Sequence, residues 1–410
     1  MMIMENIFYK QRNLAIDMLR AFTMFIMIVV NDFWKISSVP HFLEHAAYGE
    51  DFMGLADVVF PCFLFAVGLS IPYAIEGRRA KGFSTESTLI HILGRTFALL
   101  MMGVFIGNSE SGLAQNVPYP IGGYWILMVL GFLAIWNDYS KIDHLRFRYL
   151  VSLVKAVGII ILIYLALTFR NADGEVFDAK WGILGMIGFA YAVCSVVYLL
   201  SRSDIRYLWG ALLFLLSVAL FRSPLRPEFG SLPILDLPDR NFIDGFIALF
   251  HIGNGILPAF TMMGVLLSVS LARAGTLAKS HVWIIMSIVA LISAIIGYVV
   301  HNYWIVSKIS ATLPWFFYVT TIAIILYILM DMFVTNGWIG WFTYIKPAGT
   351  VTLTTYLIPY LFYALASLTT LELPDSLRSG IMGIVNCLFF AWLVIGVAGL
   401  LEKWNIKLKI

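Results

Sequence analysis

Charged residues are scarce in this chain. Asp, Glu, Lys and Arg make up 12% of its 410 residues, about half the share of a typical soluble domain. Hydrophobic residues make up 60%, and the mean hydropathy is +0.88. A chain this apolar over its whole length is not a soluble domain with one anchor. We therefore expect an all-α polytopic membrane protein with a single transmembrane domain, residues 1–410.

Other absences exclude several functions. No basic cluster suggests nucleic acid, and the formal net charge is only +3. No HExxH or CxxC spacing predicts a metal site, and no Walker or dinucleotide fingerprint occurs. The three cysteines, Cys62, Cys194 and Cys387, all fall in apolar segments. We expect them to be buried small hydrophobic residues, not disulfides or metal ligands.

Apolar windows of about 20 residues, the length that crosses a ~30 Å hydrocarbon core, divide the chain into membrane spans. Twelve windows are found, and two of them are short, so we expect eleven or twelve spans. They centre near 14–34, 53–75, 89–107, 121–137, 149–169, 181–200, 206–221, 245–271, 281–300, 313–333, 346–369 and 380–401.

Lys and Arg alternate between rich and poor connections along the chain. The positive-inside rule then places both termini in the cytoplasm. The first connection, with His41 and His45, lies on the outer face. So do the ends of later spans that carry His251, Asn254, His301 and Asn302, and Asp57 falls in the outer half of the second span. A second polar set falls at the inner face: Asp17, Arg20, Arg95 and Asp331.

Residues 31–65 concentrate polar groups between two membrane-length segments, which is expensive in lipid and indicates a working site. His45 could act as a general base or attack a thioester itself, or only cap a helix. Asp57 could orient the histidine, or be a helix charge or the partner of a structural arginine. Asn31 could donate to an oxyanion or cap its helix, and Asp32 is similar.

The inner polar set also has two interpretations. Asp17 and Arg20 share a helix face, so a structural salt bridge is one reading. The alternative is that Arg20 or Arg95 binds phosphate, for which the guanidinium is suited. The run HIGNGILPAF at 251–260 predicts a kinked or locally unwound helix, as found in secondary transporters.

Two stretches, RNLAIDMLRAFTMFIMIVVN (12–31) and HAAYGEDFMGLADVVFPCFLFAVGLSI (45–71), carry a resemblance. Together they resemble the heparan-α-glucosaminide N-acetyltransferase family and its bacterial relatives. The family pattern is a D-x-x-R-G helix ending in Asn, a His-Ala loop, and A-D-L-V-F-P-x-F-x-F. The strong match covers 14–75, and weaker patches span nearly the whole chain.

The resemblance implies transfer of an acetyl group from cytosolic acetyl-CoA to an amino sugar or glycan across the membrane. The family histidine matches His45, its helix-end asparagine matches Asn31, and its acid matches Asp57. A bacterial relative would lie in the inner membrane, and a homodimer fits the family. Arg20 and Arg95 become candidates for the CoA phosphates. Candidate acceptor-binding residues are Asp32, His251, Asn254, His301 and Asn302.

Two other functional classes stay open from the residues alone. Twelve spans with a broken helix also fit a secondary transporter of a small polar or sugar-like solute. A structural or assembly subunit is a weaker alternative, and it would tolerate loss of His45 and Asp57.

Overall fold

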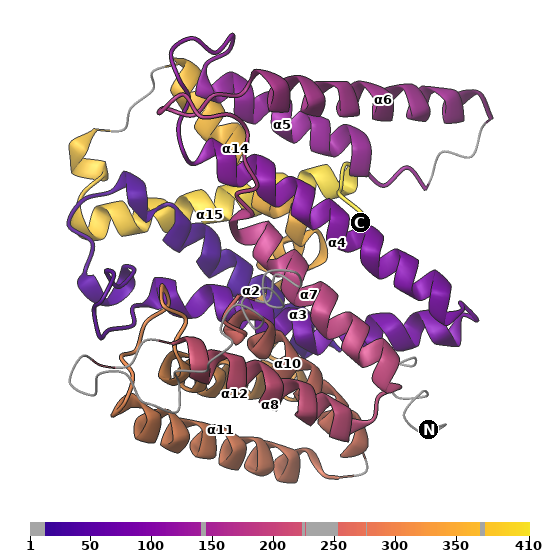
Figure 1. Ribbon diagram of the computed structural model, residues 1–410, viewed down its shortest axis with the longest axis vertical. Coiled ribbons are helices and arrows are strands. Elements are labelled where there is room, and N and C mark those ends of the chain that lie inside the picture. The colour runs from indigo at the N-terminus through magenta and orange to yellow at the C-terminus, as the bar shows by residue number, and fades with distance from the viewer. Residues whose placement is uncertain (1–12, 141–144, 224–225, 227–252, 276, 370–373) are drawn as a thin grey trace, which may run out of the picture. The chain divides into compact units, whose positions relative to one another are not determined.

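The computed structural model describes residues 13–140, 145–223, 226, 253–275, 277–369 and 374–410. These residues form helices joined by short connections, and no β-strand occurs among them (Figure 1). The α-helices are α2 (Leu14–Asn31), α3 (Leu55–Ala80), α4 (Thr85–Ser109), α5 (Ile121–Trp136), α6 (Leu145–Thr168), α7 (Gly182–Ser201), α8 (Ile205–Arg222), α10 (Ile256–Arg273), α11 (Lys279–His301), α12 (Leu313–Thr335), α13 (Phe342–Thr350), α14 (Thr352–Thr369) and α15 (Gly380–Lys403). Short 3₁₀ turns lie at Phe33–Lys35, His41–Leu43 and Asp375–Leu377.

The helices confirm a polytopic all-α membrane protein. Within the described residues, ten helices are long and apolar enough to cross a membrane, and α13 with α14 makes an eleventh if the bent pair is one span. The two members of that pair meet at 94°. Helix α5 coincides with the expected window 121–137 but has only 16 residues. Eleven spans therefore agree with the lower predicted number, and α5 is the open twelfth.

The chain divides into two compact units. Unit 1 comprises Met1–Thr23, Pro40–Thr96 and Phe189–Phe342, and unit 2 comprises Met24–Val39, Phe97–Gly188 and Thr343–Ile410. Helices α2, α4 and α7 contribute residues to both units, and α13 contributes its first residue to unit 1 and the rest to unit 2. Each unit is described by itself below.

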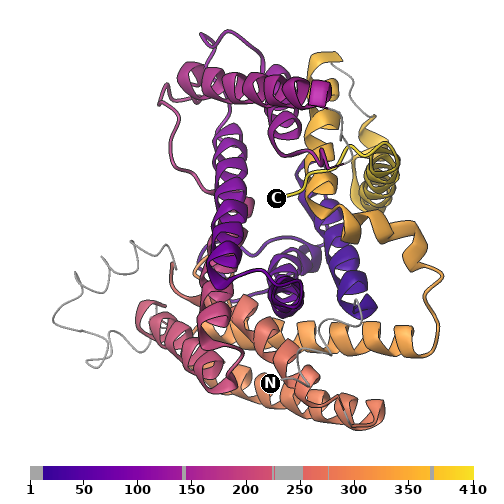
Figure 2. The ribbon, with the colours of Figure 1, turned by 90° about the vertical axis from the view of Figure 1, so that its right-hand side faces the viewer.

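Unit 1 is built on close packing of α3 against α10. A Cβ added at Gly68 would lie 1.9 Å from the carbonyl oxygen of Thr261, and one added at Gly264 would lie 2.1 Å from that of Phe65. Small residues at such crossings let two membrane helices approach backbone to backbone. Helices α11 and α12 run side by side in the same unit (Figures 1 and 2). This packing fixes the start of α3, where Asp57 lies.

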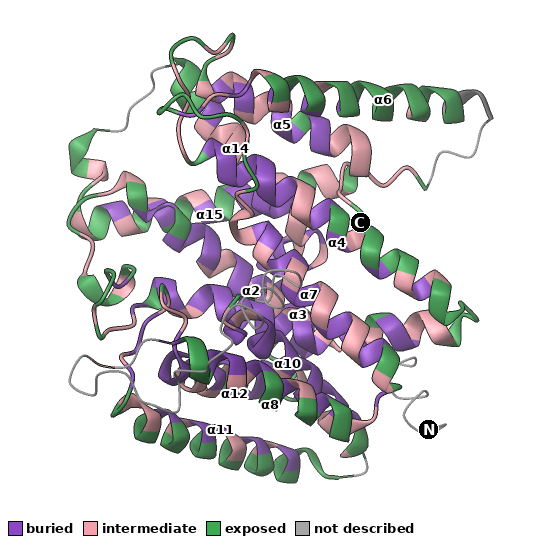
Figure 3. Cartoon of the chain, in the orientation of Figure 1, coloured by how far each residue is buried: buried purple, intermediate pink, exposed green. Residues whose placement is uncertain are grey.

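Unit 2 contains α5, α6, α14 and α15, with α5 packed between α6 and α14. Gly131 brings α5 close to α6, since a Cβ there would lie 2.8 Å from the side chain of Leu162. The far face of α6 is exposed along its length (Figure 3). Exposed apolar side chains on a span of this length are those expected to contact lipid.

Candidate active site

Asp57, at the start of α3, is the residue of the site that is held in place by the surrounding backbone. Its Oδ2 accepts hydrogen bonds from the backbone N–H groups of Ala46 (2.9 Å) and Gly54 (3.2 Å). The second bond, from the N-cap residue, belongs to a capping box at the helix N-terminus. Position 54 requires glycine, because a Cβ there would lie 2.0 Å from the carbonyl oxygen of Glu44. The Asp57 side chain is only 2% exposed. Its Oδ1 is left for another donor.

A proline in α3 ties this turn to a second helix. Pro61 has no N–H, so it cannot bond the carbonyl oxygen of Asp57 four residues earlier. The indole N–H of Trp315, in the first turn of α12, donates to that oxygen at 3.1 Å. Trp315 is itself buried. The backbone of Asp57 is thus held from outside its own helix.

His45 contacts the remaining oxygen of Asp57. Its Nδ1 lies 2.7 Å from Asp57 Oδ1, and the histidine side chain is 52% exposed. A distance this short to a carboxylate oxygen requires a proton on Nδ1, so the neutral ring carries its lone pair on Nε2. No described residue hydrogen-bonds to Nε2. The geometry presents an oriented base toward the exposed side of the ring.

Lys308 completes this cluster and was not among the residues selected from the sequence. Its Nζ lies 3.2 Å from His45 Nδ1, 3.8 Å from Asp57 Oδ1 and 3.5 Å from the carbonyl oxygen of Ala56. Burial lowers the pKa of Lys308, and the charge of Asp57 only partly offsets this. The one sequence signal for it was its position within the patch NYWIVSKISATLPW (302–315) of the resemblance.

A second aspartate–histidine pair lies at the same end of unit 1. His301 Nε2 is 2.8 Å from Asp51 Oδ1, and its Nδ1 is 3.3 Å from the hydroxyl of Tyr318. Asp51 also accepts from the Val306 N–H (2.7 Å) and from the guanidinium of Arg226. Burial raises the pKa of Asp51, but these hydrogen bonds and charges outweigh it and hold that pKa below the ordinary value.

The other predicted outer-face residues mainly satisfy backbone groups. Asn254 donates to the carbonyl oxygens of Ser310 and Ala311 (3.1 and 2.6 Å), while its Oδ1 accepts from the N–H of Ile256 at the start of α10. Asn302 donates to carbonyl oxygens in the last turn of α11. His251 lies outside the described residues. The structure thus brings His45, Asp57, Asn254 and His301 together around the segment 302–312.

The predicted kink at 251–260 takes a different form in its described part. Residues 253–255 form a turn, with Gly253 and Gly255 at positive φ (58° and 88°), and α10 begins at Ile256. Pro258 falls in the first turn of α10, where a missing N–H costs no helix bond. The glycines and proline therefore start a helix here.

Asn31 and Asp32 belong to unit 2. Asp32 is buried and accepts from Lys35 Nζ (2.9 Å) and from the hydroxyl of Tyr363 (3.0 Å). Both contacts are with Oδ1, and the predicted acceptor-binding role of Asp32 stays a prediction. Asn31 lines a cavity of unit 2. The predicted oxyanion role of Asn31 stays a prediction.

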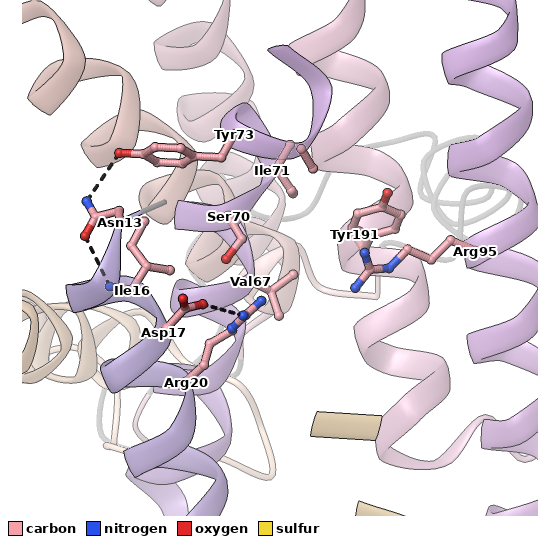
Figure 4. Close-up of a pocket in the computed structure, with 11 residues that line it drawn as sticks. Asn13, Ile16, Asp17, Arg20, Val67, Ser70, Ile71, Tyr73, Arg95 and Tyr191 are labelled. Atoms are coloured by element: carbon pink, nitrogen blue, oxygen red, sulfur yellow. Dashed lines mark hydrogen bonds and ion pairs between the residues drawn. The ribbon is translucent and has the colours of Figure 1, made fainter. Parts of the chain in front are cut away.

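Arg20 and Arg95 line one cavity of about 380 Å³ in unit 1 (Figure 4). Arg20 pairs with Asp17 at 2.8 Å, as the three-residue spacing predicts. The guanidinium of Arg95 lies over the ring of Tyr191, 4.8 Å from its centroid. Arg95 Nε is buried and has no hydrogen-bond partner among the described residues. A buried guanidinium donor without an acceptor is costly, and an anionic ligand would relieve that cost.

His45 and Asp57 do not line this cavity. Along α3, Asp57 is 13 residues from Ser70, which does line it, a separation of about 20 Å at 1.5 Å per residue. The two polar sets therefore occupy different levels of unit 1, as the sequence predicts. A passage that joins them stays a prediction.

The His, Cys, Asp and Glu side chains are scattered in the described part of the chain. No group of three or more His, Cys, Asp or Glu residues there could hold a metal ion, and the three cysteines are buried and unpaired with one another. No protein-family model matches the chain, and no curated protein was found to be similar to it. The resemblance of residues 14–75 therefore remains an observation on the sequence motif alone.

Proposed function

We propose that this protein is a transmembrane acyltransferase. It would move an acetyl or similar acyl group from cytosolic acyl-CoA to an amine or hydroxyl of an amino sugar or glycan on the far side of the membrane. In a bacterium that side is the periplasm. The observation that carries the proposal is the His45 ring, whose Nδ1 is anchored on buried Asp57 and whose Nε2 faces away without a described partner.

Acyl transfer needs a base at that nitrogen. As the acceptor nitrogen or oxygen attacks the thioester carbon, Nε2 of His45 takes its proton, and the carbon–sulfur bond breaks. The imidazolium then returns the proton to the leaving thiolate. Asp57 orients the ring and stabilises its positive form, the part that the acid plays in hydrolytic triads. The alternative route, attack by Nε2 itself to give an acyl-imidazole, uses the same geometry.

The donor would enter at the other polar level of unit 1. Acyl-CoA carries several phosphates, and Arg20 and Arg95 supply guanidinium groups to one cavity. Phosphate oxygens would satisfy the buried donor of Arg95. The acyl-bearing arm would then extend along α3 toward His45. Asn31 is proposed as the oxyanion donor on the basis of the resemblance.

The test is a transfer assay with the purified full chain in detergent. Acetyl-CoA labelled in the acetyl group is supplied with glucosamine, and free CoA and labelled product are both measured. Wild type is expected to release CoA in step with product, and His45→Ala is expected to stop both. Undiminished CoA release by His45→Ala would contradict the proposal.

A secondary transporter is the second candidate, and the break between α13 and α14 favours it. These helices meet at 94° around Val351, and Pro347 lies inside the first. Broken spans of this kind line solute sites in transporters. Proteoliposomes that accumulate unmodified labelled glucosamine, with no CoA release in the assay above, would support transport and count against acyl transfer.

A further inference from the structure

Unit 2 has its own cavity, which differs in chemistry from the basic one. Its volume is about 570 Å³. Five aromatic side chains line it, and Glu110 is the one charged residue among the described residues that do so. No Lys, Arg or His belongs to that lining. The aromatic residues are Trp34, Trp125, Tyr356, Tyr360 and Tyr363.

Few polar groups in this cavity are available to a ligand. The Tyr363 hydroxyl donates to Asp32 (3.0 Å), and the Ser109 hydroxyl donates to the Ile106 carbonyl oxygen (2.7 Å). Trp125 Nε1 is buried with no hydrogen-bond partner among the described residues. The carboxylate of Glu110 likewise forms no ion pair or hydrogen bond with a described residue. A hydroxyl-rich neutral ligand would find few partners here, and an anion would face the negative charge of Glu110.

The same unit already shows how its aromatic rings receive a cation. Lys35 Nζ lies 3.7 Å from the ring centroid of Tyr363 and 4.9 Å from that of Phe390, and it pairs with Asp32 at 2.9 Å. An ammonium group is thus held by ring faces and one carboxylate. Lys35 does not line the cavity. Lys35 already lies over Trp34 and Tyr363, two of the lining rings, whereas no described Lys or Arg lies over Trp125, Tyr356 or Tyr360. With Glu110, these three rings repeat the combination of ring faces and one carboxylate.

We propose that this cavity binds an organic ammonium ion, with Glu110 as its counter-charge and Trp125 and Tyr360 among the ring faces around it. A quaternary or alkylated ammonium suits such a box, because its apolar shell needs no hydrogen bonds and its charge is attracted to ring faces. Burial raises the pKa of Glu110, which reflects a carboxylate that lacks a compensating charge. Glu110 and Trp125, which carry this proposal, take no part in the proposed acyl transfer, although Asn31, the proposed oxyanion donor, lines the same cavity.

The test compares choline with 3,3-dimethylbutan-1-ol, its uncharged isostere in which carbon replaces nitrogen. Both are titrated into the full chain in an uncharged maltoside detergent, and binding is followed by calorimetry. Choline is expected to bind at least about tenfold more tightly, the effect of roughly 1.4 kcal/mol of charge-dependent attraction. Equal affinities, or no binding of either choline or benzyltrimethylammonium, would overturn the proposal.

Variants then locate the site. Glu110→Gln and Trp125→Leu are each expected to weaken choline binding about tenfold and to leave the isostere unchanged. Glu86→Gln is the matched control, because Glu86 is an exposed glutamate at the other end of α4. Should Trp125→Leu fail to fold, Trp125→Phe keeps the volume of a ring with a weaker face and is expected to lose a few-fold in affinity. Unchanged choline binding in the folded Glu110→Gln protein would contradict the assignment.

Discussion

Two aspartate–histidine pairs lie at one end of unit 1. A comparison of their hydrogen bonds distinguishes a histidine that is available for catalysis from one with a structural role. Both histidines contact a carboxylate at nearly the same distance, 2.7 Å for His45 and 2.8 Å for His301. His301 uses both ring nitrogens, one on Asp51 and one on the Tyr318 hydroxyl, and its side chain is 31% exposed. His45 leaves Nε2 without a described partner, and its side chain is 52% exposed. Only His45 can take a proton from a substrate without giving up a structural bond.

The two aspartates, Asp51 and Asp57, also differ in which parts of the chain supply their hydrogen-bond donors. Asp51 collects donors from separate segments, namely Arg226, His301 and the backbone of Val306, and thereby joins them. Asp57 accepts from the Gly54 N–H of its own capping box, from the Ala46 N–H and from His45, all in the connection that leads into α3, and Lys308 Nζ lies 3.8 Å away. We infer that the Asp51 pair fixes the segment 302–312, which in turn places Lys308 against the Asp57 pair.

Replacing the two histidines gives the largest expected contrast. His45→Ala should lower acetyl transfer by about 10²–10⁴-fold, the range for loss of a general base. His301→Ala should lower it by less than about tenfold, with a lower midpoint of thermal unfolding. Both rates are measured on detergent-purified protein with acetyl-CoA. Equal losses in the two folded variants would remove the distinction between the pairs.

Replacing the two aspartates should give the same order of effects on activity, with a smaller difference between the two variants. Asp57→Asn keeps the shape but turns an amide toward one of the donors that Asp57 now accepts, so we expect about 10²-fold lower kcat and a shifted pH profile. Asp57 acts as a positioning residue, so its profile should differ from that of a merely destabilised protein. Asp51→Asn should leave kcat within a few-fold.

The contribution of Asp51 to stability should depend on pH in the acidic range. Folding lowers its pKa, so its contribution to the free energy of unfolding is present above the ordinary carboxyl pKa and is lost as the pH falls through the folded pKa. The stability difference between wild type and Asp51→Asn, on the order of 1 kcal/mol near neutral pH, should therefore shrink in acid. A difference that stays constant down to pH 3 would show that the carboxylate charge is not what stabilises this segment.

Deprotonation of Lys308 should lower the rate of acyl transfer at alkaline pH. Burial lowers its pKa, so the ammonium loses its proton at a lower pH than a solvent-exposed lysine does. If its positive charge supports the developing negative charge of the reaction, wild-type activity falls as the pH rises through that pKa. Lys308→Arg keeps its charge at every accessible pH and should lose this fall, while Lys308→Met should be about tenfold slower near neutral pH. An alkaline limb retained in Lys308→Arg would assign the titration to another group.

The sequence predicted the elements and the central pair for local reasons. Apolar runs of membrane length define the spans, and His45 and Asp57 are only twelve positions apart, one in the connection between α2 and α3 and the other in the first turn of α3. Lys308 was not predicted as a site residue because its contact with His45 joins residues 263 positions apart, which no local sequence pattern reveals. The structural hydrogen bonds of Asn254 and His301 were not predicted, because the spacing of residues in a sequence cannot show which polar atoms already have partners.

The two arginines of the basic cavity differ in their charge partners, and replacing them gives the smallest expected effect. Arg20 pairs with Asp17, whereas Arg95 forms no ion pair with a described residue and lies over the ring of Tyr191. Arg95→Met removes a guanidinium whose buried Nε has no hydrogen-bond partner among the described residues, so the Kd for CoA and the KM for acetyl-CoA should rise about tenfold with kcat little changed and stability intact. Arg20→Met instead removes the cation that pairs with buried Asp17, so its main effect should be lower stability, on the order of 1–3 kcal/mol. Calorimetric titration with CoA and thermal unfolding separate the two. Unaltered CoA binding in Arg95→Met would remove this cavity from the donor site and leave the His45 cluster untouched.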